Sequence, residues 1–460
     1  MGVQDAIAEI YTFLGQRLTR SKSDLEIHGR SESHFPQSPP DAVAYPETTE
    51  EVARLVRICA AHGCPVIGWG TGTSLEGQAQ AFDGGIVVDF ARMNRILDIR
   101  AQDMDVTLQP GVTREALNQE LRATGLFFPV DPGANASLGG MASTRASGTT
   151  AVRYGTMRDN VLGLEVVTAS GEVIRTGSRA RKSSSGYDLT ALLVGAEGTL
   201  GLITELTLRL HGQPEAISSA VCGFNSVGDA VAAVIETIQM GLPMARIELM
   251  DSASVAAVNA YAGMELPETP HLLLEFHGSQ TGVAEQAETF GMIAAEHDGT
   301  GFDWATRPED RNALWTMRHN AYHAILAARP GARALVTDLC VPISRLAEAI
   351  EATQADLAQT GIEGPILGHV GDGNFHAILL FDETDREAAA AASALSERMV
   401  SRALDLGGTA TGEHGIGRGK LGYMAREHGG GWAMMGALKQ ALDPGNIMNP
   451  GKLVPPRDPS

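Results

Sequence analysis

The chain has 460 residues, with 35 Lys and Arg against 55 Asp and Glu, so its formal net charge is −20. A chain of this length needs more than one hydrophobic core, and two or three domains are expected. The negative charge disfavours nucleic acid and anionic lipid as partners, whereas it suits a basic electron-transfer partner.

The cysteines, Cys59, Cys64, Cys222 and Cys340, show no spacing typical of a metal site. They therefore predict free thiols in a reducing compartment. The N-terminal residues lack the basic-then-apolar pattern of a secretory signal, and no apolar run reaches the length of a membrane span. We expect a cytoplasmic protein, associated with a membrane only through its electron acceptor.

Residues 1–37 predict an N-terminal helix followed by a polar stretch. From residue 38 to about 215 the pattern changes to short strands and helices. Thr48 is expected to cap a helix that ends near Ala61, and a second helix spans 114–124. The expected strands are 42–45, 65–69, 84–89, 105–109, 162–168, 173–176 and a pair within 200–210.

Two loops of this region are rich in glycine and hydroxyl side chains. Gly-Thr-Gly-Thr-Ser at 70–74 directly follows a buried strand, so its amides can form a nest for phosphate oxygens, although alone it is equally compatible with a tight turn. The segment 131–155 is long for a connecting loop and is built of small residues. With the loops at 154–155 and 195–201, this pattern predicts a dinucleotide cofactor with two phosphates.

A nicotinamide cofactor is disfavoured. Asp89 lies about 20 residues after the first loop, where a dinucleotide fold places its ribose-binding acid. The third glycine of the G-x-G-x-x-G pattern is missing, however, because Ser74 and Leu75 occupy that region.

Residues 211–215 predict a linker, after which the helices become longer. The expected helices are 227–240, 282–296, 311–328, 344–359, 386–406 and 431–442, with strands at 271–276 and 334–341. Arg318 falls inside one of these helices. Arginine is suited to bind a substrate carboxylate through two parallel hydrogen bonds, and an arginine that is exposed at the surface or held in a salt bridge is the alternative.

Residues 368–380 predict a β-hairpin, because Asp372-Gly373 is a strong turn signal between apolar runs. With the turn at these two residues, His369 faces His376 with β-carbons about 5 Å apart, so the two rings can bind one metal ion. Glu413 offers a carboxylate ligand and His414 a base. A pair of histidines that only closes the hairpin is the alternative.

A set of motifs extends from about residue 38 to 453: 70–77, 132–148, 186–189, 198–201, 369–376, 412–417 and 449–452. Together they resemble the FAD-dependent D-2-hydroxy acid dehydrogenases of the vanillyl-alcohol oxidase superfamily, and among these the enzymes that oxidise D-lactate. The resemblance covers nearly the whole chain.

The resemblance implies an α+β fold. A two-lobed FAD-binding domain is expected over 38–215, after the helical segment 1–37. A C-terminal substrate- and metal-binding domain, with helices covering an antiparallel sheet, is expected over 216–455. FAD is expected to bind non-covalently, since the glycine loops hold no His or Cys that would clearly tether it. The residues expected to bind FAD are Gly70, Thr71, Gly72, Thr73, Ser74, Pro132, Gly133, Ser137, Gly139, Gly140, Ser143, Ser147, Gly148, Tyr154, Gly155, Glu197, Gly201, Ile203 and Asn449.

The resemblance also implies a catalytic site. His369, His376 and Glu413 would bind one divalent metal ion, zinc or manganese. His414 would be the base, and Arg318 would bind the substrate carboxylate. The implied reaction oxidises a D-2-hydroxy acid, foremost D-lactate, to the 2-oxo acid by hydride transfer to flavin N5. The electrons would pass to cytochrome c or a quinone, and a homodimer is compatible with this arrangement.

Two positions depart from the related D-2-hydroxyglutarate dehydrogenases. Ile378 stands where they have asparagine, and Val336 or Thr337 replaces a substrate-binding lysine. Both changes remove polar groups that would meet a second carboxylate, so a small or apolar substrate side chain is favoured. The alternatives are a D-2-hydroxyglutarate-type dehydrogenase, an FAD subunit of a glycolate oxidase complex, and a metal-dependent hydrolase without flavin.

Overall fold

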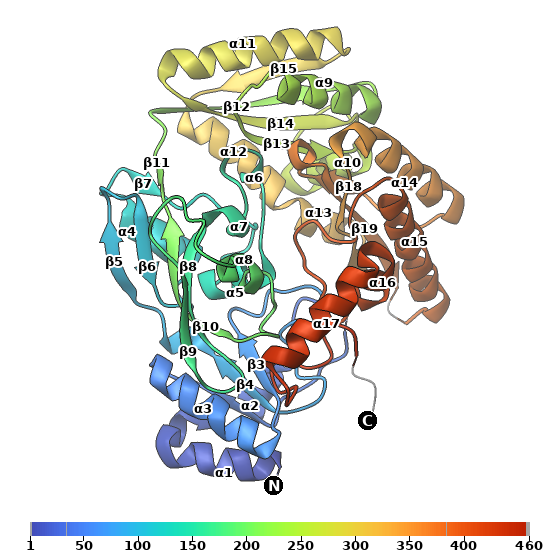
Figure 1. Ribbon diagram of the computed structural model, residues 1–460. Coiled ribbons are helices and arrows are strands. Elements are labelled where there is room, and N and C mark those ends of the chain that lie inside the picture. The colour runs from blue at the N-terminus through green and yellow to red at the C-terminus, as the bar shows by residue number, and fades with distance from the viewer. Residues whose placement is uncertain (1, 34, 383, 457–460) are drawn as a thin grey trace. The chain divides into compact units, whose positions relative to one another are not determined.

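A computed structural model describes residues 2–33, 35–382 and 384–456 (Figure 1). The chain divides into two compact units. Unit 1 comprises residues 1–147, 155–213 and 413–460, and unit 2 comprises residues 148–154 and 214–412. The chain therefore passes between the units several times.

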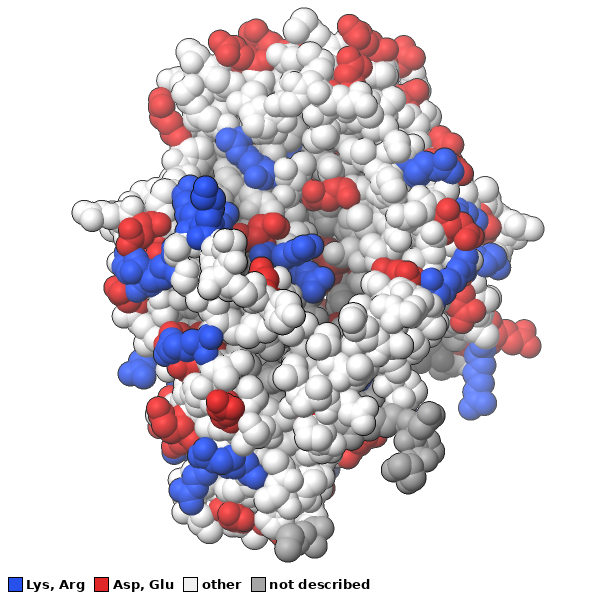
Figure 2. All heavy atoms as spheres, in the orientation of Figure 1, with Lys and Arg blue, Asp and Glu red and all other residues white. Residues whose placement is uncertain are grey.

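Charged side chains of both signs are interspersed on the face shown in Figure 2, where the described residues form no extended patch of one sign. In the five-stranded sheet described below, Arg175 forms an ion pair with Glu205 at 2.6 Å. Within the described part of the chain, no helix is both long and apolar enough to cross a membrane.

The first sheet of unit 1 has four strands in the order β1 (Leu18–Thr19), β2 (Ala42–Ala44), β4 (Ile86–Asp89) and β3 (Val66–Trp69). The last three strands are parallel. Helix α3 (Thr49–His62) is capped by the Thr48 hydroxyl, which accepts a hydrogen bond from the Glu51 amide, so the expected cap is confirmed. Helix α1 (Val3–Leu14) shares a buried apolar cluster with α3 and this sheet. Helix α2 (Lys22–His28) was not expected.

The second sheet of unit 1 is antiparallel, in the order β5 (Ile96–Arg100), β6 (Asp105–Leu108), β10 (Leu202–Arg209), β8 (Val161–Val167) and β9 (Val173–Gly177). The expected strand pair within 200–210 is wrong, because β10 is one strand that pairs with β6 and β8 on its two edges. The smaller elements of unit 1 are α4 (Arg114–Leu121), β7 (Leu126–Phe127), α7 (Met157–Asn160), α8 (Leu189–Leu193), β11 (His211–Gly212), α16 (Leu421–His428) and α17 (Gly430–Leu442).

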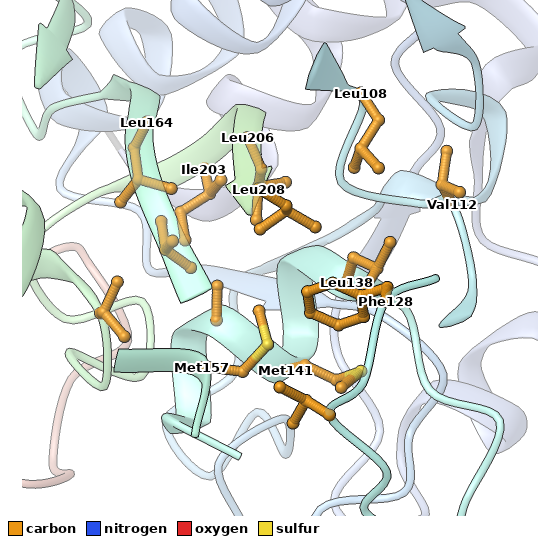
Figure 3. Packing of buried hydrophobic residues seen from close by; sticks show 14 of the residues in the cluster. Leu108, Val112, Phe128, Leu138, Met141, Met157, Leu164, Ile203, Leu206 and Leu208 are labelled. Atoms are coloured by element: carbon orange, nitrogen blue, oxygen red, sulfur yellow. The ribbon is translucent and has the colours of Figure 1, made fainter. Parts of the chain in front are cut away.

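The glycine-rich segment is not loop throughout, since it contains helix α5 (Leu138–Thr144). Leu138 and Met141, three residues apart on one helix face, are buried in the same cluster as Leu206 and Leu208 of the second sheet (Figure 3). The sequence did not predict this helix, because its two glycines and its small polar residues have low helix propensity. Part of the predicted cofactor segment is therefore held by apolar packing against the second sheet.

Unit 2 is built on a large antiparallel sheet in the order β15 (Thr300–Ala305), β12 (Ala216–Gly223), β14 (His271–Gly278), β13 (Met244–Met250), β18 (Ile366–Gly368), β19 (Asn374–Asp382) and β16 (Ala332–Val336). Strand β17 (Leu339–Cys340) also pairs with β19. Its helices are α6 (Ala151–Tyr154), α9 (Val227–Gln239), α10 (Ser252–Ala262), α11 (Gln280–Glu296), α12 (Pro308–His319), α13 (Ala321–Ala328), α14 (Leu346–Thr360) and α15 (Arg386–Asp405). The single helix expected over 311–328 is two, α12 and α13.

Helices cover both faces of this sheet (Figure 1). On β14, the Phe276 ring contacts Phe290 of α11, whereas Leu273 belongs to the apolar cluster that contains Val255 of α10 and Ile325 of α13. Positions 273 and 276 point to opposite faces of a strand, because side chains alternate. The expected antiparallel sheet covered by helices is confirmed.

The expected hairpin register is wrong. Strands β18 and β19 pair with Leu367 opposite His376, so His376 does not face His369. The chain instead makes a 3-10 turn at Val370–Asp372, and the His369 carbonyl accepts the amides of Asp372 and Asn374. The turn signal at 372–373 predicts a two-residue connection, whereas the turn is longer and leaves His369 outside the paired residues of the two strands.

Candidate functional site

His369 and His376 lie close together in unit 2 despite the altered register. His376 is on β19, and His369 immediately follows β18. Their ring centroids are 5.6 Å apart with an interplanar angle of 81°, and ring nitrogens of the two lie within 4.8 Å of each other. This spacing lets two imidazoles bind one metal ion.

The hydrogen bonds of the two rings decide which nitrogen carries the proton. His369 Nδ1 lies 2.6 Å from Glu248 Oε1, and His376 Nδ1 lies 2.9 Å from the carbonyl oxygen of Thr337. A carboxylate and a carbonyl oxygen only accept, so each Nδ1 is the donor. In the neutral rings the lone pair is then on Nε2, the state in which histidine binds a metal.

Glu248 joins His369 to Arg318. It is fully buried on β13, and its second oxygen, Oε2, accepts a hydrogen bond of 2.7 Å from Arg318 Nη2. Burial raises the pKa of Glu248, but His369 and Arg318 outweigh this and leave the pKa below its usual value, so the group is a carboxylate. Arg318 Nε is buried and has no hydrogen-bond partner among the described residues. This Nε–H group is therefore a donor that could bond to the carboxylate of a ligand.

Asp338 is a second buried carboxylate of unit 2. Its Oδ1 accepts from Asn374 Nδ2 at 2.9 Å, and its Oδ2 accepts from Thr411 Oγ1 at 2.6 Å. A β-carbon on Gly412 would lie 2.2 Å from Asn374 Nδ2, so the chain passes closely here. These contacts hold the segment that ends at Gly412, and Glu413 is the next residue.

Glu413 and His414 begin the returning segment of unit 1. There, Gln78 Nε2 donates to the His414 carbonyl at 2.7 Å. The Glu197 carboxylate accepts the amides of Ile416 and Gly417 at 2.7 and 2.8 Å. The loop that carries the predicted base is thus held by two buried polar side chains.

The two positions that depart from the D-2-hydroxyglutarate enzymes are buried and carry no charged group. The Thr337 hydroxyl accepts the Ala377 amide at 2.9 Å. Ile378 pairs with Val336 across the two strands and is buried in the cluster that contains Trp315. Both positions are thus part of the strand pairing and packing of unit 2.

The first glycine loop follows β3 in unit 1. A β-carbon on Gly70 would lie 2.2 Å from Ser137 Oγ, which brings this loop against the start of α5. The hydroxyls of Ser74 and Ser137 are buried and have no hydrogen-bond partner among the described residues. Close backbone and unused hydroxyl donors fit the phosphates of a bound dinucleotide.

Other predicted cofactor residues have local roles. Ile203 packs in the second apolar cluster, and Gly201 lies where a β-carbon would be 2.6 Å from Val166 Cγ1. The Ser143 hydroxyl bonds to the Gly139 carbonyl, and Tyr154 Oη lies 2.7 Å from His277 Nδ1. The following also lie in loops: Thr71, Gly72, Thr73, Pro132, Gly133, Ser147, Gly148 and Gly155.

The C-terminal segment folds back onto the glycine loops. Asn449 Nδ2 donates to the carbonyl oxygens of Gln78 and Glu197, at 3.0 and 2.6 Å. Lys452 Nζ, which is buried, donates to the carbonyl oxygens of Gln78 and Gln80. The polar atoms of Asn449 thus join three segments of unit 1.

Glu248, Asp338 and Gln78 are not among the residues that the sequence predicts for the site. The signal for Glu248 is an acid within the mostly apolar residues 244–250, which also contain Arg246 and form strand β13. Asp89, by contrast, is buried. Its carboxylate lies 2.8 Å from His28 Nε2 and accepts a hydrogen bond from the Ala91 amide. This bonding gives Asp89 a structural role.

Comparison with known proteins defines the class. The family model "FAD binding domain" matches residues 40–177, and "FAD linked oxidases, C-terminal domain" matches residues 213–453. The solved structure of p-cresol methylhydroxylase with substrate bound has a TM-score of 0.80 at 18% identity, over 98% of this chain and 96% of that chain. The protein is a flavoprotein oxidoreductase with the expected α+β fold.

Two relatives narrow this class. The chain is 50% identical over 433 residues to "Probable D-lactate dehydrogenase, mitochondrial" of Danio rerio, which covers 93% of this chain and 87% of that protein. It is 42% identical over 456 residues to D-lactate dehydrogenase (cytochrome), mitochondrial, of Arabidopsis thaliana, covering 98% and 80%. The chain belongs to the FAD-linked oxidase family of the vanillyl-alcohol oxidase type, which confirms the resemblance.

The expectation of a cytoplasmic protein is wrong against these relatives, because both are mitochondrial. Free thiols indicate a reducing compartment but do not identify which one.

Proposed function

We propose that this protein oxidises D-lactate, or a D-2-hydroxy acid of similar size, to the 2-oxo acid and passes the electrons to a cytochrome. The observation that carries the proposal is the shared carboxylate of Glu248, which places a metal-ligand histidine beside an arginine with an unused donor. D-lactate dehydrogenases at 42–50% identity support the substrate, and the Arabidopsis name supports the acceptor.

We assign binding of FAD to residues 38–215 and binding of substrate and metal to residues 216–455. FAD, when bound, supplies the acceptor for the hydride from the substrate α-carbon. Gly70, Ser74, Ser137 and Gly140 are the residues whose close backbone or unused hydroxyls best suit its phosphates. The remaining predicted FAD-binding residues stay part of the proposal.

Three residues would hold a divalent metal: His369 and His376 through Nε2, and Glu413 through its carboxylate. Zinc or manganese suits such ligands and would supply a Lewis acid that lowers the pKa of the substrate hydroxyl. Arg318 binds and orients the carboxylate of the substrate. His414 accepts the hydroxyl proton, a role suited to a side chain that titrates near neutrality.

The substrate side chain is proposed to be small. Neither Thr337 nor Ile378 offers a positive charge for a second carboxylate: Thr337 is buried and its oxygen accepts the Ala377 amide, and Ile378 is packed in an apolar cluster. A buried, unpaired carboxylate is costly, so a dicarboxylate would bind poorly at these positions.

The test is an anaerobic absorption spectrum of the purified protein before and after D-lactate is added, with L-lactate and D-2-hydroxyglutarate as comparisons. Bleaching of the flavin band by D-lactate, followed by reoxidation with a cytochrome, supports the proposal. Bleaching only by D-2-hydroxyglutarate would reassign the substrate. A colourless protein that takes up no added FAD would overturn the assignment.

A further inference from the structure

We propose that Glu248 is a positioning residue that couples metal binding to binding of the substrate carboxylate. The inference rests on the proposed function. It adds a residue that is neither a predicted metal ligand nor a predicted substrate-binding or catalytic residue. Glu248 uses one oxygen for His369 and the other for Arg318, at 2.6 and 2.7 Å. One carboxylate therefore orients both groups.

The sheet places Glu248 between its two partners. It lies on β13, a strand paired on both edges, where Leu249 is opposite Gly368 of β18. His369 is the residue after Gly368, so the pairing of these strands brings its ring beside Glu248. Arg318 reaches the same carboxylate from α12. Because Glu248 is fully buried, its oxygens are not exposed to bulk solvent.

Only a carboxylate can serve both partners. His369 Nδ1 and Arg318 Nη2 are both donors, so their common partner must accept twice at two separate atoms. A glutamine of the same shape has one accepting oxygen and one amide nitrogen that donates. It would satisfy one partner and place a donor against the other. The His369 ring would then lose the bond that keeps its proton on Nδ1 and its lone pair on Nε2.

The consequence is a coupling between the two binding events. A substitution of Glu248 should weaken two interactions at once: binding of the metal by His369 and binding of the substrate carboxylate by Arg318. Loss of Arg318 should weaken binding of the substrate carboxylate but leave the His369 ring oriented by Glu248. Outer partners of metal-bound histidines typically contribute 10- to 100-fold in metal affinity.

The experiment compares Glu248→Gln, Glu248→Asp and Arg318→Met with Asp251→Asn. Aspartate keeps the buried charge but is too short to reach both partners, so it serves if the glutamine variant does not fold. Asp251, the buried residue after β13, caps α10 by accepting the Ser254 amide, a role asparagine fills equally well. It controls for loss of a carboxylate near the site.

Zinc and manganese affinities are measured by calorimetry on metal-stripped, FAD-loaded protein, and KM and kcat for D-lactate are measured with saturating metal. Both Glu248 variants should lose 10- to 100-fold in metal affinity and show a raised KM. Arg318→Met should raise KM alone, and Asp251→Asn should match wild type. Unchanged metal affinity in both Glu248 variants would overturn the inference while leaving the proposed function intact. A wild-type protein that binds neither metal would overturn the metal site and the inference together.

Discussion

The Nδ1 of His376 donates to the backbone carbonyl of Thr337, at 2.9 Å, so a strand neighbour sets the orientation of this ring. His369 is instead oriented by a side chain, Glu248. The two proposed ligands are therefore held by different means, one by the sheet backbone and one by a buried carboxylate.

His369→Ala and His376→Ala should each strip the metal and leave FAD bound, because neither histidine is among the residues proposed to bind FAD. His369→Ala also leaves the buried Glu248 with one partner fewer, so it should lower the melting temperature more than His376→Ala. Metal content by mass spectrometry and the flavin absorbance of the same samples check this. Full metal occupancy in either variant would remove that histidine from the ligand set.

His414→Ala should abolish turnover of D-lactate while FAD and metal remain bound. The backbone of this loop is held by Gln78 and Glu197, not by the imidazole, so the loop should keep its place. The rate of flavin reduction is measured under anaerobic conditions. His297→Ala, at a histidine that pairs with Glu236 away from the predicted site residues, is the control. Retained reduction in His414→Ala would show that another group accepts the proton.

Gly139 and Gly140 allow a matched test of the cofactor loop. A β-carbon on Gly139 would lie 2.4 Å from Pro110 Cβ and 2.9 Å from the Pro110 carbonyl oxygen, whereas one on Gly140 meets only the Ser137 hydroxyl, at 3.0 Å. Gly139→Ala should therefore destabilise the fold, because the Pro110 backbone would have to shift to make room for the new methyl group. Gly140→Ala should fold normally but bind FAD more weakly, since its open side is the proposed cofactor face. Thermal melts and FAD titrations distinguish the two, and normal FAD affinity in Gly140→Ala would move the cofactor elsewhere.

Ile378→Asn tests the substrate side chain. An asparagine buried in the apolar cluster around Trp315 would lack partners, so we expect a loss of about 1–3 kcal/mol in the free energy of unfolding. The ratio of kcat/KM for D-2-hydroxyglutarate over D-lactate should rise. Ile378→Val is the control, with a cost of about 1 kcal/mol and an unchanged ratio. An unchanged ratio in the asparagine variant would show that this position does not select the substrate.

His211 should contribute to acid sensitivity. Burial, with Arg209 and Arg181, lowers the pKa of His211 to about 4, from the 6.5 expected of an exposed ring. Between these values the unfolded chain binds a proton that the folded chain does not, so stability falls as the pH drops from about 6.5 to 4. Denaturant unfolding at pH 7.5 and 5 should show a smaller loss for His211→Gln than for wild type. Equal losses would mean that His211 is protonated in the folded protein.

Local patterns predicted most elements of the fold. Thr48 marked the start of α3 because a hydroxyl before an acidic turn is a local capping signal. The strands around residues 66, 86 and 161 were visible as short apolar runs. Elements that depend on distant partners were missed, such as β13, whose apolar run resembles other buried segments until β14 and β18 pair with it.

The sequence by itself determined the chemistry available to this protein: glycine loops for a dinucleotide, two histidines, an acid and an arginine. The tertiary structure alone decided how these groups are held. The register of β18 and β19 removed His369 from the pairing predicted for it, and the neighbouring strand β13 supplied Glu248, 121 residues earlier in the chain, to orient its ring. Turn signals and side-chain periods act over a few residues, whereas a buried carboxylate finds its partners only when distant strands and a helix pack together.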